Sequence, residues 1–66
     1  MTEQDLVVDA LKTAKTVVNE HFDNIGMIVE TIGVLKFLIK HVKDEDYKTA
    51  LMSVSVDLMF LAMAIM

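Results

Sequence analysis

The chain has 66 residues, enough for one domain over 1–66, and 55% of them are hydrophobic. Its formal net charge is −4, with six lysines and no arginine, which argues against nucleic-acid binding because that affinity depends on neutralising phosphates. Cysteine is absent, which excludes disulfides and thiolate metal sites. Packing and association are left to stabilise the fold, since a domain this small buries only about 60% of its unfolded surface.

The first predicted element is a helix over about 3–22. Apolar residues recur at spacings of three and four, which places them on one face of an α-helix. They are Leu6, Val7, Ala10, Leu11, Ala14, Val17, Val18 and Phe22, with His21 among them. Thr2 is the predicted N-cap, and Glu3 and Asp5 in the first turn favour the positive end of the helix dipole.

A second helix is predicted over about 27–43, after a break at residues 23–26. Asp23 and Asn24 compete for backbone hydrogen bonds, and Gly26 is a poor helix former. The apolar heptad pattern nevertheless continues across this segment. An alternative is therefore one long helix over 3–43, followed by a C-terminal helix in a hairpin. We favour the break because it gives three helices of similar length, which pack without overhang.

Gly33 and Phe37 form a candidate groove on the second helix. Gly26 and Gly33 are seven residues apart and share a face, with Phe37 one turn beyond. Such a face suits close approach by a partner helix or a flat ligand. The competing interpretation, which we weight more heavily, places Gly26 in the turn and treats Gly33 as a tolerated weak point.

The third predicted helix spans 45–66, with Asp44 as its N-cap. No polar residue follows Asp57. A helix that is apolar on all sides must be covered on all sides, and two neighbouring helices cannot do so. We therefore predict an all-α, three-helix bundle that is completed by oligomerisation. The predicted interface consists of Leu58, Met59, Phe60, Leu61, Met63, Ile65 and Met66.

Asp57 and Ser53 are the candidate buried polar pair of this helix. They lie one turn apart among apolar residues, where a charge is costly unless it is hydrogen-bonded or paired. One interpretation is a polar contact inside an oligomer that fixes its register. The other is that both lie on a narrow solvated edge of the helix, and the sequence favours neither.

These features predict a small acidic, non-enzymatic protein that self-associates as a homo-oligomer (a dimer or larger) and acts by binding a protein partner, as a regulator or inhibitor. No motif indicates catalytic, metal-binding or cofactor-binding residues, so we expect no cofactor. The first residues have no signal-peptide features, and we expect a cytoplasmic protein.

Two alternatives remain. One is a membrane-active protein that inserts its apolar C-terminal helix, which is disfavoured because Ser53, Ser55 and Asp57 interrupt the apolar run. The other is a helical oligomer that sequesters a small ligand between its subunits, in an apolar inter-helix pocket with His21, Tyr47 or Asp57 at its rim.

Overall fold

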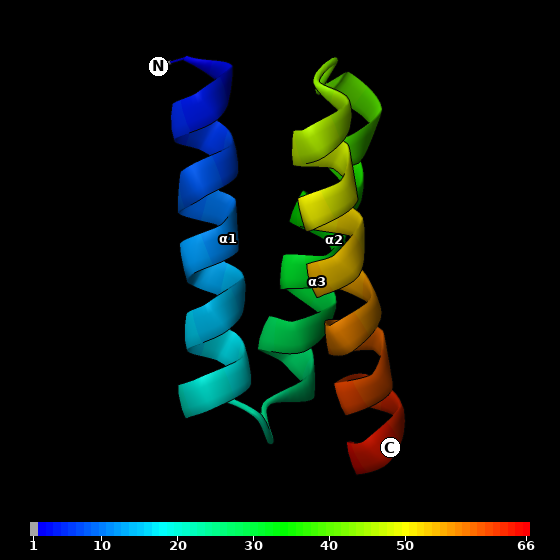
Figure 1. Cartoon of the computed structure of the whole chain (residues 1–66). Helices are drawn as coiled ribbons and strands as arrows, with labels where there is room; N and C mark the ends of the chain where they lie inside the picture. Colours follow the sequence, from blue (N-terminus) through cyan, green and yellow to red (C-terminus); the bar gives the residue numbers. More distant parts are fainter. Residues whose placement is uncertain (1) are drawn as a thin grey trace.

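The computed structural model describes residues 2–66, which form three helices and no strand: α1 (Glu3–Glu20), α2 (Ile25–His41) and α3 (Glu45–Ile65). The helices run alternately down, up and down, so the two ends of the chain lie at opposite ends of the bundle (Figure 1). The predicted three-helix, all-α fold is confirmed. The alternative of one continuous helix over 3–43 is wrong.

The break between α1 and α2 comes from Asn24. Its side-chain Oδ1 accepts a hydrogen bond from the backbone N–H of Met27 at 3.1 Å. This bond satisfies an otherwise free donor in the first turn and starts a new helix. The boundaries differ from those predicted, because α1 ends at Glu20 and α2 begins at Ile25. Gly26 consequently lies in the first turn of α2 and not in the connection.

Two further N-caps lie together at the opposite end of the bundle. The Thr2 hydroxyl accepts from the backbone N–H of Asp5 at 3.2 Å, and the Asp5 carboxylate accepts from that of Thr2 at 3.4 Å. Asp44 Oδ1 accepts from the N–H groups of Asp46 and Tyr47, at 2.8 and 3.2 Å. Both predicted N-caps, Thr2 and Asp44, are confirmed.

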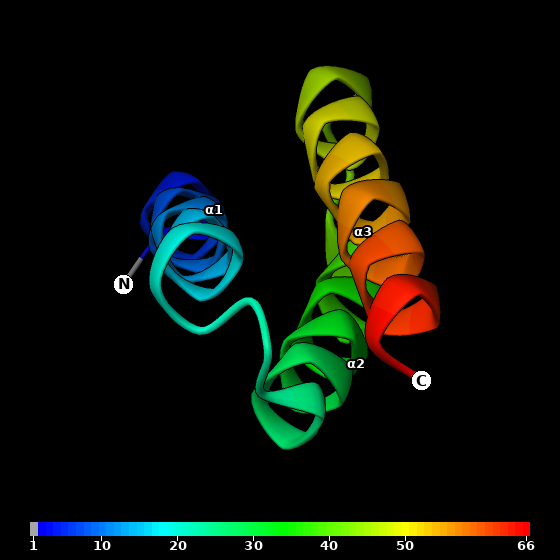
Figure 2. The same ribbon diagram turned by 90° about the horizontal axis from the view of Figure 1, so that it is seen from below.

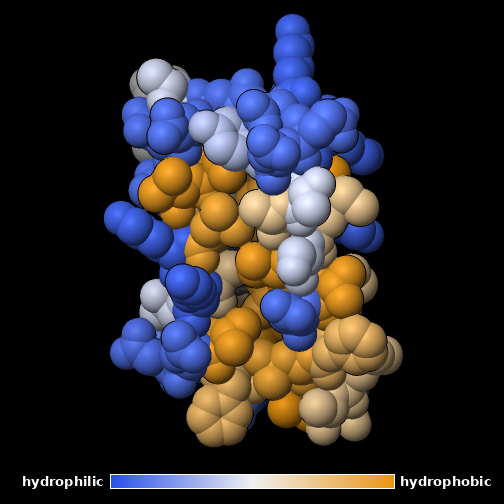
Figure 3. Space-filling view, viewed as in Figure 1, coloured by the Kyte–Doolittle hydropathy of each residue, from blue (hydrophilic) through white to orange (hydrophobic). Residues whose placement is uncertain are grey.

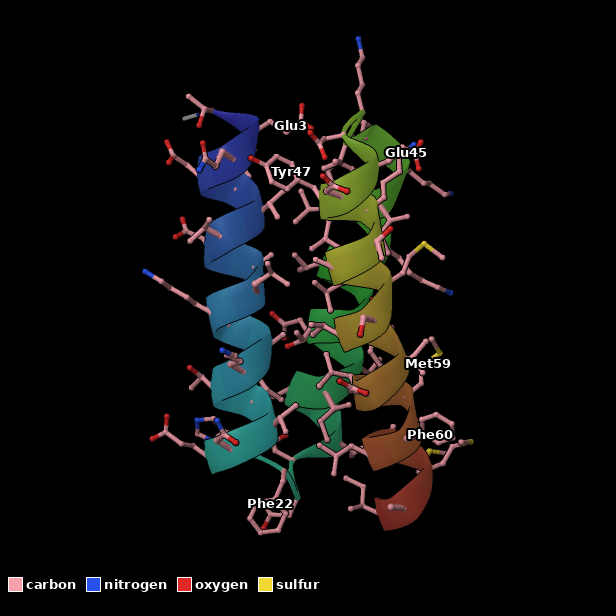
Figure 4. The ribbon with its side chains drawn as sticks, viewed as in Figure 1. Glu3, Phe22, Glu45, Tyr47, Met59 and Phe60 are labelled. Carbon is pink, nitrogen blue, oxygen red and sulfur yellow. The ribbon has the colours of Figure 1, made fainter. Side chains whose placement is uncertain are left out.

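A hydrogen bond across 40 residues of sequence joins the elements at this end. The Glu3 carboxylate, in the first turn of α1, accepts from the backbone N–H of Lys43 at 3.2 Å. Lys43 lies in the connection between α2 and α3. Figure 4 shows Glu3 beside this connection and Tyr47 extending from α3 toward α1. The start of α1 is thereby fixed to the turn that joins the other two helices.

The core is a single apolar cluster to which every helix contributes. Its fully buried members lie on the inward face of each helix at spacings of three, four or seven. They include Val7, Ala14 and Val17 of α1, Ile28 and Leu35 of α2, and Leu51 and Leu58 of α3. Buried Thr31 donates its hydroxyl to the Met27 carbonyl at 2.7 Å, so its polar group is satisfied.

Helix α1 is the least closely packed of the three. Seen from below, α2 and α3 cross in contact while α1 stands beside them (Figure 2). The accessible surface is 4636 Å². A compact protein of this mass is expected to expose about 4200 Å². The bundle is therefore slightly open, and grooves separate its helices.

Candidate interaction site

The surface of the protomer carries an unusual amount of apolar material. Among residues 2–66, sixteen large hydrophobic side chains are exposed, whereas ten hydrophobic residues form the buried core. Figure 3 shows that they are unevenly placed: hydrophilic residues cover the end with the N-terminus and the α2–α3 connection, and hydrophobic residues dominate the other end. The apolar surplus expected from the composition is thus gathered mainly at one end.

We call this second region the apolar end. It includes the α1–α2 connection, the start of α2 and the last two turns of α3. Its exposed members are Phe22, Ile25, Phe60, Met63, Ile65 and Met66. Phe22 extends below the end of α1, and Phe60 points outward from α3 (Figure 4). Phe60 is 63% exposed. Exposed apolar patches are common where proteins bind other proteins or membranes.

The predicted interface residues separate into two groups. Met59, Phe60, Met63, Ile65 and Met66 are exposed and available to a partner. Leu61 is half-buried against the core.

Leu58 must be removed from the predicted interface, because it is fully buried inside the protomer. It lies seven residues after Leu51 and so shares the inward face of α3.

Asp57 and Ser53 are both exposed, so the single chain does not bury the candidate polar pair. Asp57 lines a shallow pocket with Lys15 and Asn19 of α1. The buried polar residue of α3 is instead Ser55, whose hydroxyl has no hydrogen-bond partner among the described residues. Sequence analysis missed Ser55. Its position four residues after Leu51, on the core face, was the available signal.

Gly33 and Phe37 lie in the wall of a hollow of about 590 Å³ between α2 and α3. The small side chain of Ser55 and the flexible side chains of Met52 and Met59 line it from the α3 side. A Cβ added at Gly33 would meet no atom within 4 Å. The Phe37 ring stacks on that of His41, with centroids 4.3 Å apart, and remains 61% exposed.

A second groove, of about 410 Å³, lies between α1 and α2. Its walls are apolar, with Leu6 and Val17 from α1 and Leu35 from α2, while Asp9 and Glu30 bring acidic groups to it. This groove lies within one chain, whereas the small-ligand alternative places its pocket between subunits, so that alternative stays a prediction. Among residues 2–66, no three His, Asp or Glu side chains gather as a metal site would require.

The helix α3 is long and apolar enough to cross a membrane, by length and composition. Its most hydrophobic 18-residue window has a mean hydropathy of 1.6, and 22% of that window is buried in the bundle.

In comparisons with known proteins, no family model, no curated protein and no solved structure matches this chain. The exposed apolar end and the hollows on either side of α2 are therefore the features that can indicate a function.

Proposed function

We propose that this protein is a non-enzymatic, cytoplasmic helical module that self-associates through its apolar helix faces and regulates a protein partner by binding it. The observation that supports this most directly is the apolar end, where Phe22, Phe60, Met63 and Met66 are exposed together. Burying one such side chain fully contributes about 1.5–3 kcal/mol. The end therefore offers a driving force comparable to the stability of the small domain itself, roughly 3–10 kcal/mol at its length.

The chemistry of the apolar end favours a partner that presents an apolar helix or groove. Two of its members, Met63 and Met66, are methionines, and exposed Met59 lies one turn before Met63 on α3. Unbranched, polarisable side chains adapt to irregular apolar surfaces and are frequent where a protein must fit a partner. No charged side chain belongs to this end of α3, since the residues after Asp57 are all apolar.

Sedimentation analysis without detergent tests the proposal. The wild-type protein is expected to sediment as a species heavier than the 7.4 kDa chain, in a concentration-dependent manner. Phe60→Glu and Met63→Glu place a charge on the apolar end and should give lighter species. Thr16→Glu adds the same charge to an exposed position of α1 and should leave the distribution unchanged. A wild-type protein that stays a monomer at all concentrations would contradict the proposed self-association.

Membrane insertion of α3 is the second candidate, favoured by the length and hydropathy of that helix. Against it, the helix carries Asp57, and a carboxylate near the middle of a bilayer costs about 2.5–3.5 kcal/mol on insertion scales. Insertion would also separate Leu51 and Leu58 from the core. This alternative expects the wild type to need detergent and Phe60→Glu to be more soluble, so the same sedimentation series separates the two candidates.

A further inference from the structure

The outer face of α2 indicates how two copies meet. We propose that α2 of one chain pairs antiparallel with α2 of a second copy, so that Phe37 of each chain covers Gly33 of the other. The inference rests on the proposed self-association and names its two-fold contact. The apolar end lies outside this contact, so it can join such dimers into larger assemblies or bind a protein partner.

The residues of this face form a regular seam. Gly26, Glu30, Gly33, Phe37 and Lys40 follow one another at alternating spacings of four and three, and all are exposed. This is the heptad spacing with which paired helices meet. The buried residues Ile28, Thr31 and Leu35 lie on the opposite side of the same helix. The seam therefore points directly away from the core of its own chain.

The packing of the protomer does not require a glycine at position 33. Glycine inside a helix costs about 1 kcal/mol relative to alanine. Space does not require it here, because a Cβ at this position would meet no atom within 4 Å. A glycine whose own fold leaves room for a side chain is explained by the close approach of another backbone or ring. The hollow beside it, of about 590 Å³, gives an inserted side chain room.

Phe37 is the side chain that fits this space. When two α2 helices run antiparallel with their midpoints at Leu35, residues equally far before and after that position lie in the same layer. Gly33 and Phe37 are such a pair, so the ring of each copy lies over the glycine of the other. The flexible Met52 and Met59 line the hollow and can adapt to the ring, with favourable sulfur–aromatic contact.

Charge selects the antiparallel direction. Glu30 and Lys40 are also equally far from Leu35, so each antiparallel dimer brings the carboxylate of one copy toward the ammonium group of the other, twice. A parallel pair would place like charges together. Within the protomer neither group takes part in an ion pair, since the one ion pair among residues 2–66 joins Lys48 and Glu45 at 3.9 Å. Both charges therefore remain available to the second copy.

The charges provide a direct test by native mass spectrometry of mixed variants. Glu30→Lys alone and Lys40→Glu alone each create two like-charge pairs in the dimer, and we expect homodimers about tenfold weaker than wild type. When the two variants are mixed, one of them labelled with nitrogen-15, each mutated residue meets an opposite charge. The heterodimer should then clearly exceed the one-half share expected from random mixing. The doubly reversed E30K/K40E chain, with wild-type composition, should dimerise as wild type does.

Gly33→Leu supplies an independent measurement. A Cβ at position 33 would meet no atom within 4 Å, the position lies beside a hollow of about 590 Å³, and leucine is a better helix former than glycine, so thermal stability should not fall. The same side chain occupies the space needed by Phe37 of the second copy, so dimerisation should weaken at least tenfold. Gly33→Ala, a smaller addition, should weaken it less.

The outcomes separate this inference from the proposal on which it rests. Random mixing of the charge variants, with oligomers still present, would overturn the α2 pairing and leave self-association intact. Unchanged dimerisation of Gly33→Leu would overturn the pairing as well. A wild-type chain that never associates would overturn both proposals. Preferential heterodimers together with a weakened Gly33→Leu dimer would support the antiparallel arrangement.

Discussion

The two ends of the bundle differ in how their helix termini and connections are covered. The polar end is the end that holds the N-terminus and the α2–α3 connection. There Thr2 and Asp44 cap two helices, and the Glu3 carboxylate accepts a hydrogen bond from the backbone of Lys43. At the apolar end, Asn24 caps α2. Phe22 is exposed in the connection before that helix, and Met66 is exposed after the end of α3. One end is closed by hydrogen bonds within the chain, whereas the other exposes surface that a second molecule can bury.

The contrast extends to the helix termini. The first turn of α3 contains Glu45 and Asp46, which suit the positive end of its dipole. Its last turn contains no basic residue to interact with the free carbonyl groups. The apolar end is thus less stabilised by local interactions than the polar end. Under the proposed function, the polar end stabilises the fold and the apolar end binds other molecules.

The largest expected loss of stability comes from disrupting the apolar core, to which every helix contributes. Leu35 is fully buried at the middle of α2, so Leu35→Lys places an uncompensated charge there. We expect a loss of about 3–5 kcal/mol in the free energy of unfolding. That is a large part of the roughly 3–10 kcal/mol available to a domain of this length. Thermal unfolding followed by far-ultraviolet circular dichroism measures it.

Thr16→Lys is the matched control for the core substitution. Thr16 is exposed on α1, and its hydroxyl bonds only to the Lys12 carbonyl one turn earlier, at 3.1 Å. The change in unfolding free energy should stay within about 0.5 kcal/mol. Equal destabilisation by the two lysines would show that the inward face of α2 is assigned incorrectly.

On the C-terminal part of α3, we expect folding and association to depend on different residues. Leu58 is fully buried and Phe60, two residues later, is 63% exposed. Leu58→Ala should cost about 2–5 kcal/mol because it leaves a cavity. Phe60→Ala should cost the protomer less than about 0.5 kcal/mol while weakening association. Urea unfolding compares the stability of the two variants, at protein concentrations too low for association. A greater loss of stability from Phe60→Ala than from Leu58→Ala would mean that the protomer itself depends on the exposed ring.

The sequence predicted the helices well because their signals are local. Thr2 and Asp44 act through bonds to their own first turns, and the buried positions follow the helical period. The tail was harder to assign. A run without polar residues has no contrast from which to infer its inward face, so Leu58 was grouped with its exposed neighbours.

Ser55 was missed for a related reason. Polarity suggested a surface position, whereas the spacing from Leu51 and Leu58 placed it in the core. Which surfaces lie open depends on how the helices are arranged in space, and local patterns do not determine that.

At the polar end, the cap of α3 is expected to matter less than the core but measurably. Asp44→Ala removes the acceptor for the N–H groups of Asp46 and Tyr47 and should cost about 1 kcal/mol. Asp44→Asn keeps a good capping side chain and should change stability little. Chemical unfolding of the two variants provides the comparison. If the asparagine variant loses as much as the alanine variant, the contribution comes from charge and not from capping.

The smallest expected effect concerns the hydrogen bond from the Lys43 backbone to Glu3, which tests whether the polar end is held as one unit. The bond is solvent-exposed and 3.2 Å long, so Glu3→Ala should lower the free energy of unfolding by about 0.5–1 kcal/mol, including the loss of a favourable charge in the first turn. Gln4→Ala, at the neighbouring exposed position, should have less effect.

Hydrogen exchange locates the effect of Glu3. Loss of the bond should increase exchange at the Lys43 amide, 40 residues away in sequence, while the amides at the start of α2 remain as protected as in wild type. Glu3→Gln retains an oxygen acceptor without the charge and should preserve most of the protection at Lys43. Unchanged exchange at Lys43 in Glu3→Ala would mean that the turn is held by the Asp44 cap alone, and that the polar end owes its stability to each helix separately.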